Sequence, residues 1–580
     1  MRLAWRTLSP MLWKYRRGLG IGLGALLLKD LFGALLPLAI KAGVDSLTQG
    51  FALSKLLWFT GAMLALSAVK GVFQFIMRVR IIGVSRDVEY DMRQDLFAHL
   101  MRLDQGFFGR YRTGDIMARA TNDLNAVRMM MGPGVMYWTE TSITFVLAAT
   151  IMAYVDWKLT LVALLPAPIV SLAVIWFGRQ IHMRFERIQA LFSDISSRVQ
   201  ENLSGVRVIR AYVQEENQLH QFERLNQDYI KQNMKLVLTS GMFMPMLETL
   251  IGMALLIVLW VGGARLLEGH MTLGSFLMFN VYMGILAWPM IALGWVVNLM
   301  QRGTASLERL NALMAEKPSI TAPARPVALP DPIRGEIAFR DVTVQFGDRR
   351  AIDELNLTIP AAATVAIVGH TGSGKTTLVH LIPRMIDPTR GAVLLDGTDL
   401  REFDPEPLRR AIGFVPQETF LFSATLGENI AFGVPSATEE EIRRAASLAG
   451  LGPDLEGFPN GLATVVGERG ITLSGGQKQR TAIARAILRD PSILILDDAL
   501  SSVDTVTEEA ILQNLAGVMK GRTTILISHR VSTVRLADRI FVIEEGRLAE
   551  QGTHEELVTL GGYYADLHQR QLLEEELETI

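Results

Sequence analysis

Residues 364–377 read TVAIVGHTGSGKTT, and this stretch decides the fold of the second half of the chain. A β-branched apolar run ends at Gly369, and the residues from Gly369 to Thr376 fit the pattern G-x-x-x-x-G-K-[ST]. The glycines let backbone N–H groups curl around phosphate oxygens. Lys375 can reach the β- and γ-phosphates, and Thr376 offers its hydroxyl to Mg²⁺. The order strand, loop, helix predicts an α/β domain with a nucleotide-binding loop.

Two later stretches carry groups that such a loop needs. The apolar run 493–496 ends at Asp497, and a carboxylate at the tip of a buried strand can hold the Mg²⁺ shell, usually through water. Residues 473–477 read LSGGQ just before a predicted helix, which suits the serine hydroxyl and the glycine N–H groups to grip a γ-phosphate. Because the loop 369–376 already surrounds the phosphates on one side, LSGGQ makes sense if it closes on a nucleotide held by another subunit.

Composition indicates two kinds of domain. The chain has 580 residues, too many for one compact domain, and 49% are hydrophobic while 20% are charged. This mixture predicts a membrane part joined to a soluble part. The net charge of −2 says little about partners, but the lack of a basic tail or of interleaved aromatic and basic residues argues against nucleic acid. The absence of cysteine excludes disulfides, zinc–thiolate sites and cysteine catalysis.

Residues 1–317 are predicted to form the membrane part. Six stretches reach the roughly 20 residues that a bilayer requires. They are 18–46, 55–80, 133–155, 159–181, 241–266 and 272–300. The basic N-terminus could be taken for a signal peptide, but the run after it carries Lys29 and Asp30 and lacks a small-residue cleavage site. We therefore expect a retained first membrane helix that starts in the cytosol.

The long connections 81–132 and 182–240 are charged, and the first is rich in arginine. This excess of positive charge places both connections and both termini in the cytosol. Their helical periodicity predicts membrane helices that extend far into the cytosol and join at short turns, one at Thr113-Gly114-Asp115 and one at 204–212. Independent cytosolic hairpins with no coupling role are the alternative.

Ionisable residues interrupt the predicted spans, namely Lys29, Asp30, Lys70, Glu140 and Glu248. Each costs at least ~2.5 kcal/mol in lipid, so we expect them to face a cavity, a partner charge or an interface. A polar-lined substrate path and simple pairing between helices both remain open as roles for these residues.

A group of methionines also has two possible interpretations, either an adaptable surface for apolar ligands or ordinary packing. That group is Met242, Met244, Met246 and Met253.

The proline-rich segment 318–332 is predicted to be a linker, followed by the α/β domain at 333–580. The motifs GHTGSGKT (369–376), LSGGQKQR (473–480), ILILDD (493–498) and ISHR (527–530) together resemble the ATP-binding cassette of an ABC transporter. With the six-helix part before it, essentially the whole chain resembles an ABC exporter half-transporter.

The resemblance implies a fold and a setting. The fold is an α-helical polytopic membrane domain of the type I exporter kind, followed by an α/β P-loop NTPase domain. ATP and Mg²⁺ would be the cofactors. The protein would lie in the inner or plasma membrane with its nucleotide-binding domain in the cytosol. Its partners would be a second half-transporter subunit, a hydrophobic small-molecule or lipid substrate, and membrane lipid.

The resemblance also implies roles for single residues. Phe346 matches the aromatic residue that stacks on adenine, with a place in the strand core as the alternative. Gln417 matches the glutamine that senses Mg²⁺ and the γ-phosphate, and His529 matches the switch histidine. Glu468 and the segments 113–123 and 205–212 match contacts between the two domains, and Asp504 matches a loop that crosses to the partner. The implied ATP-binding residues are Phe346, Gly369, His370, Thr371, Gly372, Ser373, Gly374, Lys375, Thr376, Thr377, Ser474, Gly475, Gly476 and Gln477. The implied metal-binding residues are Thr376, Gln417 and Asp497, and the implied catalytic residues are Asp498, His529 and Gln417.

Asp498 departs from the family pattern, which has glutamate there to activate water. The shorter side chain draws the carboxylate back by roughly one C–C bond, ~1.5 Å, and a misplacement near 1 Å can cost ~10²-fold in rate. The expectation is a slow site and a heterodimer, as in bacterial multidrug exporters, in which this chain's LSGGQ completes the partner's site. A lipid or lipid-precursor flippase, possibly homodimeric, is one alternative. A regulatory or structural ABC protein without transport is another.

Overall fold

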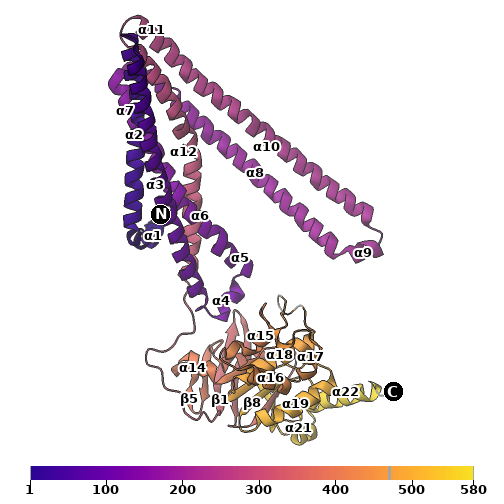
Figure 1. The fold of residues 1–580 in the computed structure, drawn as a ribbon. Coiled ribbons are helices and arrows are strands. Elements are labelled where there is room, and N and C mark those ends of the chain that lie inside the picture. Colours follow the sequence, from indigo (N-terminus) through magenta and orange to yellow (C-terminus); the bar gives the residue numbers. More distant parts are fainter. Residues whose placement is uncertain (1, 468–469, 471, 579–580) are drawn as a thin grey trace. The chain divides into compact units, whose positions relative to one another are not determined.

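The computed structural model describes residues 2–467, 470 and 472–578, and the chain divides into two compact units. The first comprises 1–101 and 112–316, and the second comprises 102–111 and 317–580. Figure 1 shows that the first unit is built from helices and that the second combines sheets and helices. Glu468, predicted to contact the membrane part, lies outside the described residues.

The first unit consists of long helices with three π-helical stretches. They are α1 (Arg2–Lys14), α2 (Arg16–Thr48), α3 (Leu53–Leu100), α5 (Thr113–Ala118), η1 (Arg119–Asp123), α6 (Leu124–Met129), η2 (Met130–Gly134), α7 (Val135–Leu164), α8 (Ala167–Ser204), α9 (Val206–Ala211), α10 (Glu215–Ile257), η3 (Val258–Gly262), α11 (Gly263–Leu267) and α12 (Leu273–Met314). Helices satisfy every backbone polar group within the segment, which lipid demands. Close packing of α2 on α3 depends on Gly22, where a Cβ would stand 2.6 Å from Cγ1 of Ile81.

Among the described residues, five helical stretches are long and apolar enough to cross a membrane. They are 16–48, 53–100, 113–164, 215–267 and 273–314. The segment 159–181, predicted as the fourth of six spans, is divided between two helices. It begins after Asp156, whose φ of −156° and ψ of 100° break the helix, and it is interrupted again before Ala167, where α8 begins. The Asp156 carboxylate accepts hydrogen bonds from the N–H groups of Lys158 and Leu159, both at 3.1 Å, which holds this break in place.

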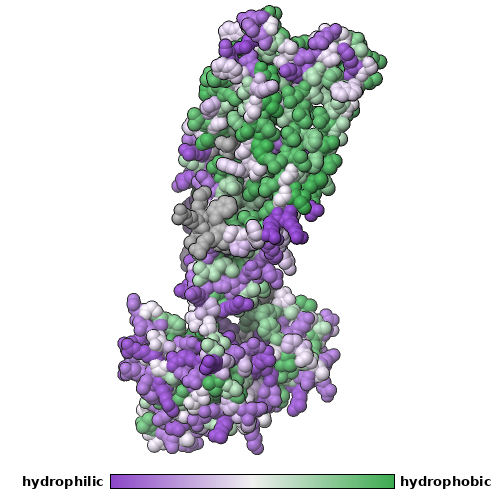
Figure 2. All heavy atoms as spheres, turned by 90° about the vertical axis from the view of Figure 1, so that its left-hand side faces the viewer, coloured by the Kyte–Doolittle hydropathy of each residue, from purple (hydrophilic) through white to green (hydrophobic). Residues whose placement is uncertain are grey.

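Apolar side chains cover the outside of the helical unit, as Figure 2 shows for one face. Large examples with more than half of their surface exposed include Trp58, Phe75, Tyr154 and Trp260. An apolar surface of this extent on a long helical bundle is typical of contact with lipid. The second unit is mostly hydrophilic on the face shown.

The structure moves one of the two predicted cytosolic turns. Thr113-Gly114-Asp115 was expected to be a turn but forms the first turn of α5, because the Arg112 carbonyl accepts hydrogen bonds from the N–H groups of Asp115 and Ile116. The chain bends earlier, around Asp104, which caps the short helix α4 (Gln105–Arg110) by accepting a hydrogen bond from the N–H of Phe107. At 204–212 the predicted turn is present and contains α9, which joins the neighbouring helices α8 and α10 (Figure 1).

The second unit contains two sheets and short helices. Its strands are β1 (Ile337–Phe346), β2 (Arg349–Ile359), β3 (Thr364–Val368), β4 (Arg390–Leu395), β5 (Thr398–Asp399), β6 (Ile412–Val415), β7 (Ile493–Asp497), β8 (Thr523–Ile527), β9 (Arg539–Glu544) and β10 (Arg547–Gly552). Its helices after α4 are α13 (Lys375–Leu381), η4 (Leu400–Glu402), α14 (Pro405–Arg410), α15 (Leu426–Ile430), η5 (Ala431–Gly433), α16 (Glu439–Leu448), α17 (Gly452–Gly457), η6 (Gly461–Ala463), α18 (Gly475–Leu488), α19 (Thr505–Met519), α20 (Val531–Val534), α21 (His554–Leu560) and α22 (Tyr563–Glu578). From 317 to 336 the backbone is irregular except for a bridge between Val327 and Phe403.

The order of the larger sheet positions the site. Its strands run β10-β9-β3-β8-β7-β6, and all neighbours from β9 to β6 are parallel. Every residue of β7 and β8 is buried, as expected for a parallel sheet covered on both faces. Because β3, β8 and β7 are adjacent and parallel, their carboxyl ends meet at one edge, where ligands of open α/β sheets bind.

Candidate nucleotide site

The phosphate loop joins β3 to α13 through glycines that no other residue could replace without strain. Gly369 has φ +151° and Gly374 has φ +104°. A Cβ on Gly369 would stand 2.1 Å from the carbonyl oxygen of Ile543, and one on Gly374 would stand 2.4 Å from that of Ala351. Backbone therefore packs closely against the loop at both glycines, and a side chain at either position would displace it.

Lys375 is the buried cation of this loop. Its residue is 7% exposed, and Nζ donates hydrogen bonds of 2.8 Å to the carbonyls of Gly369 and His370. Burial lowers the pKa of this ammonium group, although the charges of Asp497 and Asp498 act in the opposite direction. A largely desolvated ammonium group beside a glycine loop is suited to bind phosphate oxygens.

Asp497, at the end of β7, is the candidate metal-binding carboxylate. Thr376 Oγ1 lies 3.4 Å from one of its oxygens, while its other oxygen, Oδ2, is buried without a hydrogen-bond partner in the described chain. Burial raises the pKa of Asp497 to about 6, and the neighbouring charge of Asp498 adds to this, whereas Thr376 and Lys375 lower it. A free buried carboxylate oxygen beside a threonine hydroxyl fits Mg²⁺, which takes oxygen ligands and usually only one or two carboxylates. Bound there, Mg²⁺ would neutralise phosphate charge.

The nucleotide pocket, about 430 Å³, gathers predicted residues from distant parts of the chain. Its predicted lining residues are Phe346, Thr371, Gly372, Gly374, Lys375, Thr376, Thr377, Gln417, Asp497, Asp498 and His529. Phe346 is 55% exposed, so its alternative place in the strand core is wrong. Arg349 also lines this pocket, and sequence reasoning missed it. Its position three residues after Phe346, at the start of the next strand, could have indicated it.

Other predicted ATP-binding residues do not line this pocket. The ring of His370 packs edge-on against that of Tyr563, with ring centres 4.5 Å apart, so its side chain faces α22. Gly369 and Ser373 belong to the loop without lining the pocket, and Ser373 Oγ is buried without a hydrogen-bond partner in the described chain. This free hydroxyl gives the loop one more group that a phosphate could satisfy.

The LSGGQ segment forms the start of α18. Ser474 is its N-cap, accepting a hydrogen bond from the N–H of Gln477, and the Gln477 side chain accepts one in return from the N–H of Ser474. Ser474 and Gly475 are exposed, and Gly476 and Gln477 are partly exposed. None of the four lines the pocket around Lys375. The segment is therefore an exposed helix N-terminus that can accept an anion from outside this pocket.

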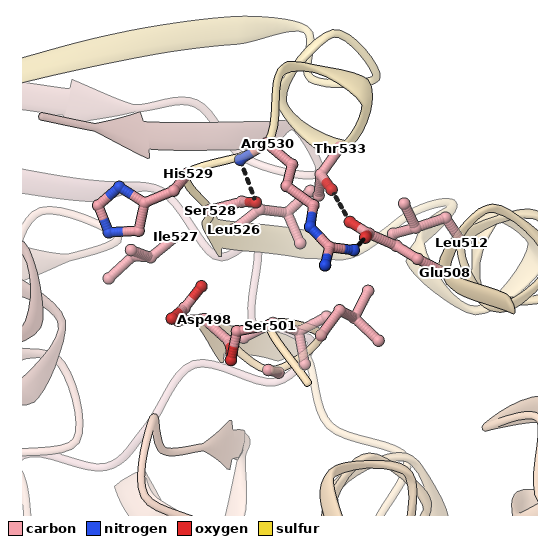
Figure 3. A pocket seen from close by; sticks show the side chains of 13 residues that line it. Asp498, Ser501, Glu508, Leu512, Leu526, Ile527, Ser528, His529, Arg530 and Thr533 are labelled. Carbon is pink, nitrogen blue, oxygen red and sulfur yellow. Dashed lines mark hydrogen bonds and ion pairs between the residues drawn. The ribbon is translucent and has the colours of Figure 1, made fainter. Parts of the chain in front are cut away.

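Asp498 and His529 lie at one end of a second cavity of about 240 Å³, and the group of Arg530, Glu508 and Thr533 lies at the other (Figure 3). Buried Glu508 pairs with Arg530 and accepts a hydrogen bond from the Thr533 hydroxyl. Arg530 also donates to the Val503 carbonyl at 3.0 Å. This network ties the segment after β8, which carries His529, to Glu508 on α19 and to Val503 just before that helix.

Asp498 and His529 are held in place by different interactions. Asp498 has φ +49°, a left-handed conformation that aspartate tolerates better than most residues, and its N–H donates to the Ile527 carbonyl at 2.9 Å. Burial and nearby Lys375 lower the pKa of His529, while Asp498 opposes this effect. His529 is therefore neutral near pH 7 and can donate one hydrogen bond to a phosphate oxygen.

Asp504, which was expected to reach a partner subunit, caps α19. Its carboxylate accepts a hydrogen bond of 2.9 Å from the N–H of Thr507.

The glycine loop, the carboxylate at the end of β7, the histidine after β8 and a separate exposed LSGGQ helix occur together in one α/β unit. Fused to a helical membrane unit, this combination is that of an ABC transporter half. Family models agree: residues 19–290 match the ABC transporter transmembrane region, and residues 352–501 match the ABC transporter domain. The chain belongs to the ABC transporter family, and it is a multi-pass membrane protein with an ATPase domain that drives transport.

Curated relatives cover nearly the full length. The probable multidrug resistance ABC transporter ATP-binding/permease protein YheI of Bacillus subtilis is 38% identical over 93% of this chain and 92% of the relative. The multidrug resistance-like ATP-binding protein MdlA of Escherichia coli is 36% identical over 99% and 98%. The ATP-dependent lipid A-core flippase of Syntrophus aciditrophicus is 34% identical over 93% and 90%.

A solved structure of a bacterial Atm1-family ABC exporter with ATP bound has a similar fold. Its TM-score is 0.80 at 28% identity, with 96% of this chain and 99% of that chain covered. The predicted fold class, a helical membrane domain followed by an α/β nucleotide-binding domain, is thereby confirmed.

Proposed function

We propose that this chain is one subunit of a heterodimeric ATP-driven exporter for hydrophobic or amphipathic compounds, and that its own ATP site hydrolyses slowly. The nucleotide unit would lie in the cytosol, beneath the inner or plasma membrane, with ATP and Mg²⁺ as cofactors. The observation that carries this proposal is the aspartate at position 498, which lines the same two cavities as His529. Relatives named as multidrug transporters support the substrate class.

The geometry separates binding from hydrolysis. Lys375, Thr376 and Asp497 line one pocket and would hold Mg²⁺ and ATP. Asp498 stands in the same pocket, but its carboxylate ends one methylene earlier than that of glutamate, so it reaches an attacking water poorly. The site would thus retain ATP while hydrolysing it roughly 10²-fold more slowly than a glutamate site.

The exposed LSGGQ helix supports the heterodimer. Ser474 to Gln477 do not line the chain's own pocket, so they remain available to the ATP of a second subunit. A homodimer would contain two slow sites, whereas a partner with glutamate at the equivalent position would provide one fast site. This chain would complete that fast site with an intact LSGGQ segment.

The experiment compares the chain alone with the chain co-expressed with a half-transporter encoded by a neighbouring gene. We expect weak ATPase activity from the chain alone and strong activity from the complex. In the complex, Asp498→Asn should leave most activity, whereas replacing the partner's glutamate should abolish it. Vigorous hydrolysis by the purified chain alone, or the reverse ranking of the two variants, would contradict the proposal.

A lipid or lipid-precursor flippase is the second candidate function. The flippase relative supports it, and so does a cavity with charged lining residues within the helical unit. Transport assays in liposomes with a fluorescent lipid and a fluorescent hydrophobic cation would separate the two functions.

A further inference from the structure

A polar cavity of about 160 Å³ lies inside the helical unit, between α2, α3, α7 and α12. Its charged lining consists of Lys29 and Asp30 on α2, Lys70 on α3 and Glu140 on α7. An apolar cavity of about 150 Å³ can hold a molecule the size of benzene, whereas pockets for whole drug-sized ligands measure about 300–1,000 Å³. The volume therefore suits the head group of an amphipathic molecule.

One buried ammonium group serves two carboxylates in this cavity. Lys29 is 4% exposed, and its Nζ lies 2.5 Å from Glu140 Oε1 and 2.7 Å from Asp30 Oδ1. Pairing between helices, one of the two roles open for these residues, is therefore present. With all three groups ionised, this trio keeps one excess negative charge, and Lys70, the fourth charged residue of the cavity, balances it without making an ion pair to either carboxylate in the described chain.

Asp30 carries the unsatisfied part of that charge. The residue is 6% exposed, and its Oδ2 is buried without a hydrogen bond of normal geometry in the described chain, although the Thr144 hydroxyl lies beside the carboxylate. The hydroxyl of Tyr282, which also lines the cavity, is already used, because it donates to the Ala34 carbonyl at 2.6 Å. A ligand can supply a donor to this oxygen, and an ammonium group would also pair with the charge that Lys29 leaves unbalanced.

Lys70 offers the complementary group. It lines the same cavity beside Gly33, where a Cβ would stand 3.7 Å from its Nζ, and within the described residues it makes no ion pair or hydrogen bond. An acidic group on the ligand would satisfy it. Leu147, Ile285 and Trp288 complete the wall and suit an adjoining hydrocarbon chain.

We propose that this cavity binds the zwitterionic head of an amphipathic molecule, with Asp30 holding an ammonium group and Lys70 holding an acidic group. The inference deepens the proposed export function, on which its role in transport rests, by naming the substrate class. Asp30 requires N–H donors, so the cavity favours a primary amine over a quaternary one.

The test measures equilibrium binding to the purified full chain without nucleotide or partner. The probes are lysophosphatidylethanolamine, lysophosphatidylcholine with the same acyl chain, and an alkyl phosphate. The first two differ in N–H donors, and the third lacks the amine altogether. A fourth probe is a dodecyl amphiphile with an amino-carboxylate head. Its binding indicates a site for zwitterionic heads in general, and its exclusion indicates a site for phospholipid heads.

We expect the ethanolamine probe to bind at least tenfold more tightly than the choline probe. Asp30→Asn should remove this preference while leaving the Lys29–Glu140 pair intact, and Lys70→Met should weaken all three phosphate probes about equally. The matched control is Glu248→Gln, an exposed carboxylate of a predicted span outside this cavity, which should leave binding unchanged.

Equal binding of the two lysophospholipids by the unmodified chain would overturn the proposal, as would a preference that persists in Asp30→Asn or disappears in Glu248→Gln. Thermal unfolding of each variant checks that it is folded. If Asp30→Asn does not fold, the test rests on Lys70→Met. Unchanged binding of the three phosphate probes by that variant would then overturn the proposal. Because binding is measured without ATP, its failure is independent of the ATPase results that test the heterodimer.

Discussion

The side-chain amide of Gln571, on the C-terminal helix α22, donates a hydrogen bond of 2.5 Å to the backbone carbonyl of His529. The carbonyl of the same amide accepts a hydrogen bond of 2.7 Å from the N–H of Val531. One glutamine thus holds the backbone on both sides of Arg530. Helix α22 therefore helps to position the backbone of His529, although Gln571 lies about forty residues away in the sequence.

Loss of this clamp should reduce hydrolysis without abolishing ATP binding. We expect Gln571→Ala, made in an Asp498→Glu chain with measurable activity, to lower kcat about 5–30-fold, because two hydrogen bonds contribute about 1–2 kcal/mol. Gln571→Glu keeps the acceptor and should have a smaller effect. The control is Gln569→Ala, an exposed glutamine on the same helix. Equal losses in the two alanine variants would argue against a positioning role.

Asp498→Glu should activate the chain's own site. The longer side chain extends the carboxylate by ~1.5 Å toward the water, which predicts a rise of about 10²-fold in ATPase rate. Steady-state phosphate release by the purified chain checks this, with Asp498→Asn as the inactive control. An Asp498→Glu chain as slow as the unmodified one would show that another feature limits the site.

The two glycines at 372 and 374 should differ in their tolerance of alanine. Both have positive φ, +84° and +104°, so alanine costs about 1–2 kcal/mol of strain at either position. Only at Gly374 would the new Cβ also meet a backbone carbonyl, that of Ala351 at 2.4 Å, whereas the nearest atom to a Cβ at Gly372 is the Arg349 guanidinium at 3.6 Å. Gly374→Ala should therefore weaken binding of a fluorescent ATP analogue more than tenfold, and Gly372→Ala clearly less. The reverse order would contradict this packing of the loop.

One ion pair lies outside the predicted spans 133–155 and 272–300, in the parts of two long helical stretches that are expected to extend into the cytosol, and it should make stability depend on pH. Arg309 donates two hydrogen bonds to Asp123, at 3.0 Å and 2.5 Å. Burial alone would raise the pKa of Asp123, but bonds from Arg309 and Ser306 outweigh it and hold the pKa below the ordinary 3.8. Since the folded pKa is lowered, this stabilisation is present above about pH 4 and is lost as the pH falls through the folded value.

Asp123→Asn should lower the free energy of unfolding by about 1 kcal/mol at pH 7, a modest value because the Arg309 side chain is half exposed. The difference in melting temperature between the variant and the unmodified protein should shrink as the pH falls from 5 to 3. Arg309→Gln serves as the matched change on the other partner. A difference that stays constant with pH would exclude an ionised Asp123 as its source.

Much of the nucleotide site could be predicted because its parts are local. The glycine pattern of 369–376 requires particular backbone angles, and the strands before Gly369 and Asp497 follow from short apolar runs, so these elements stand where they were expected. The start of α18 at Gly475 likewise follows from the capping pattern of Ser474 and Gln477. The turn predicted at Thr113-Gly114-Asp115 was misplaced. The start of a helix depends on which backbone carbonyl accepts its first hydrogen bond, and here that carbonyl belongs to Arg112.

The sequence by itself determined the class of protein, the phosphate loop and the aspartate at 498, since these depend on residue type and spacing. The tertiary structure decided which distant side chains come together in one pocket or form hydrogen bonds. Sheet order brings Gln417 and His529 to the pocket of Lys375, and packing of α22 brings Gln571 to His529. It also decided that Lys29, Asp30, Lys70 and Glu140 share one cavity. Such meetings depend on the packing of elements far apart in the chain, which local patterns do not specify.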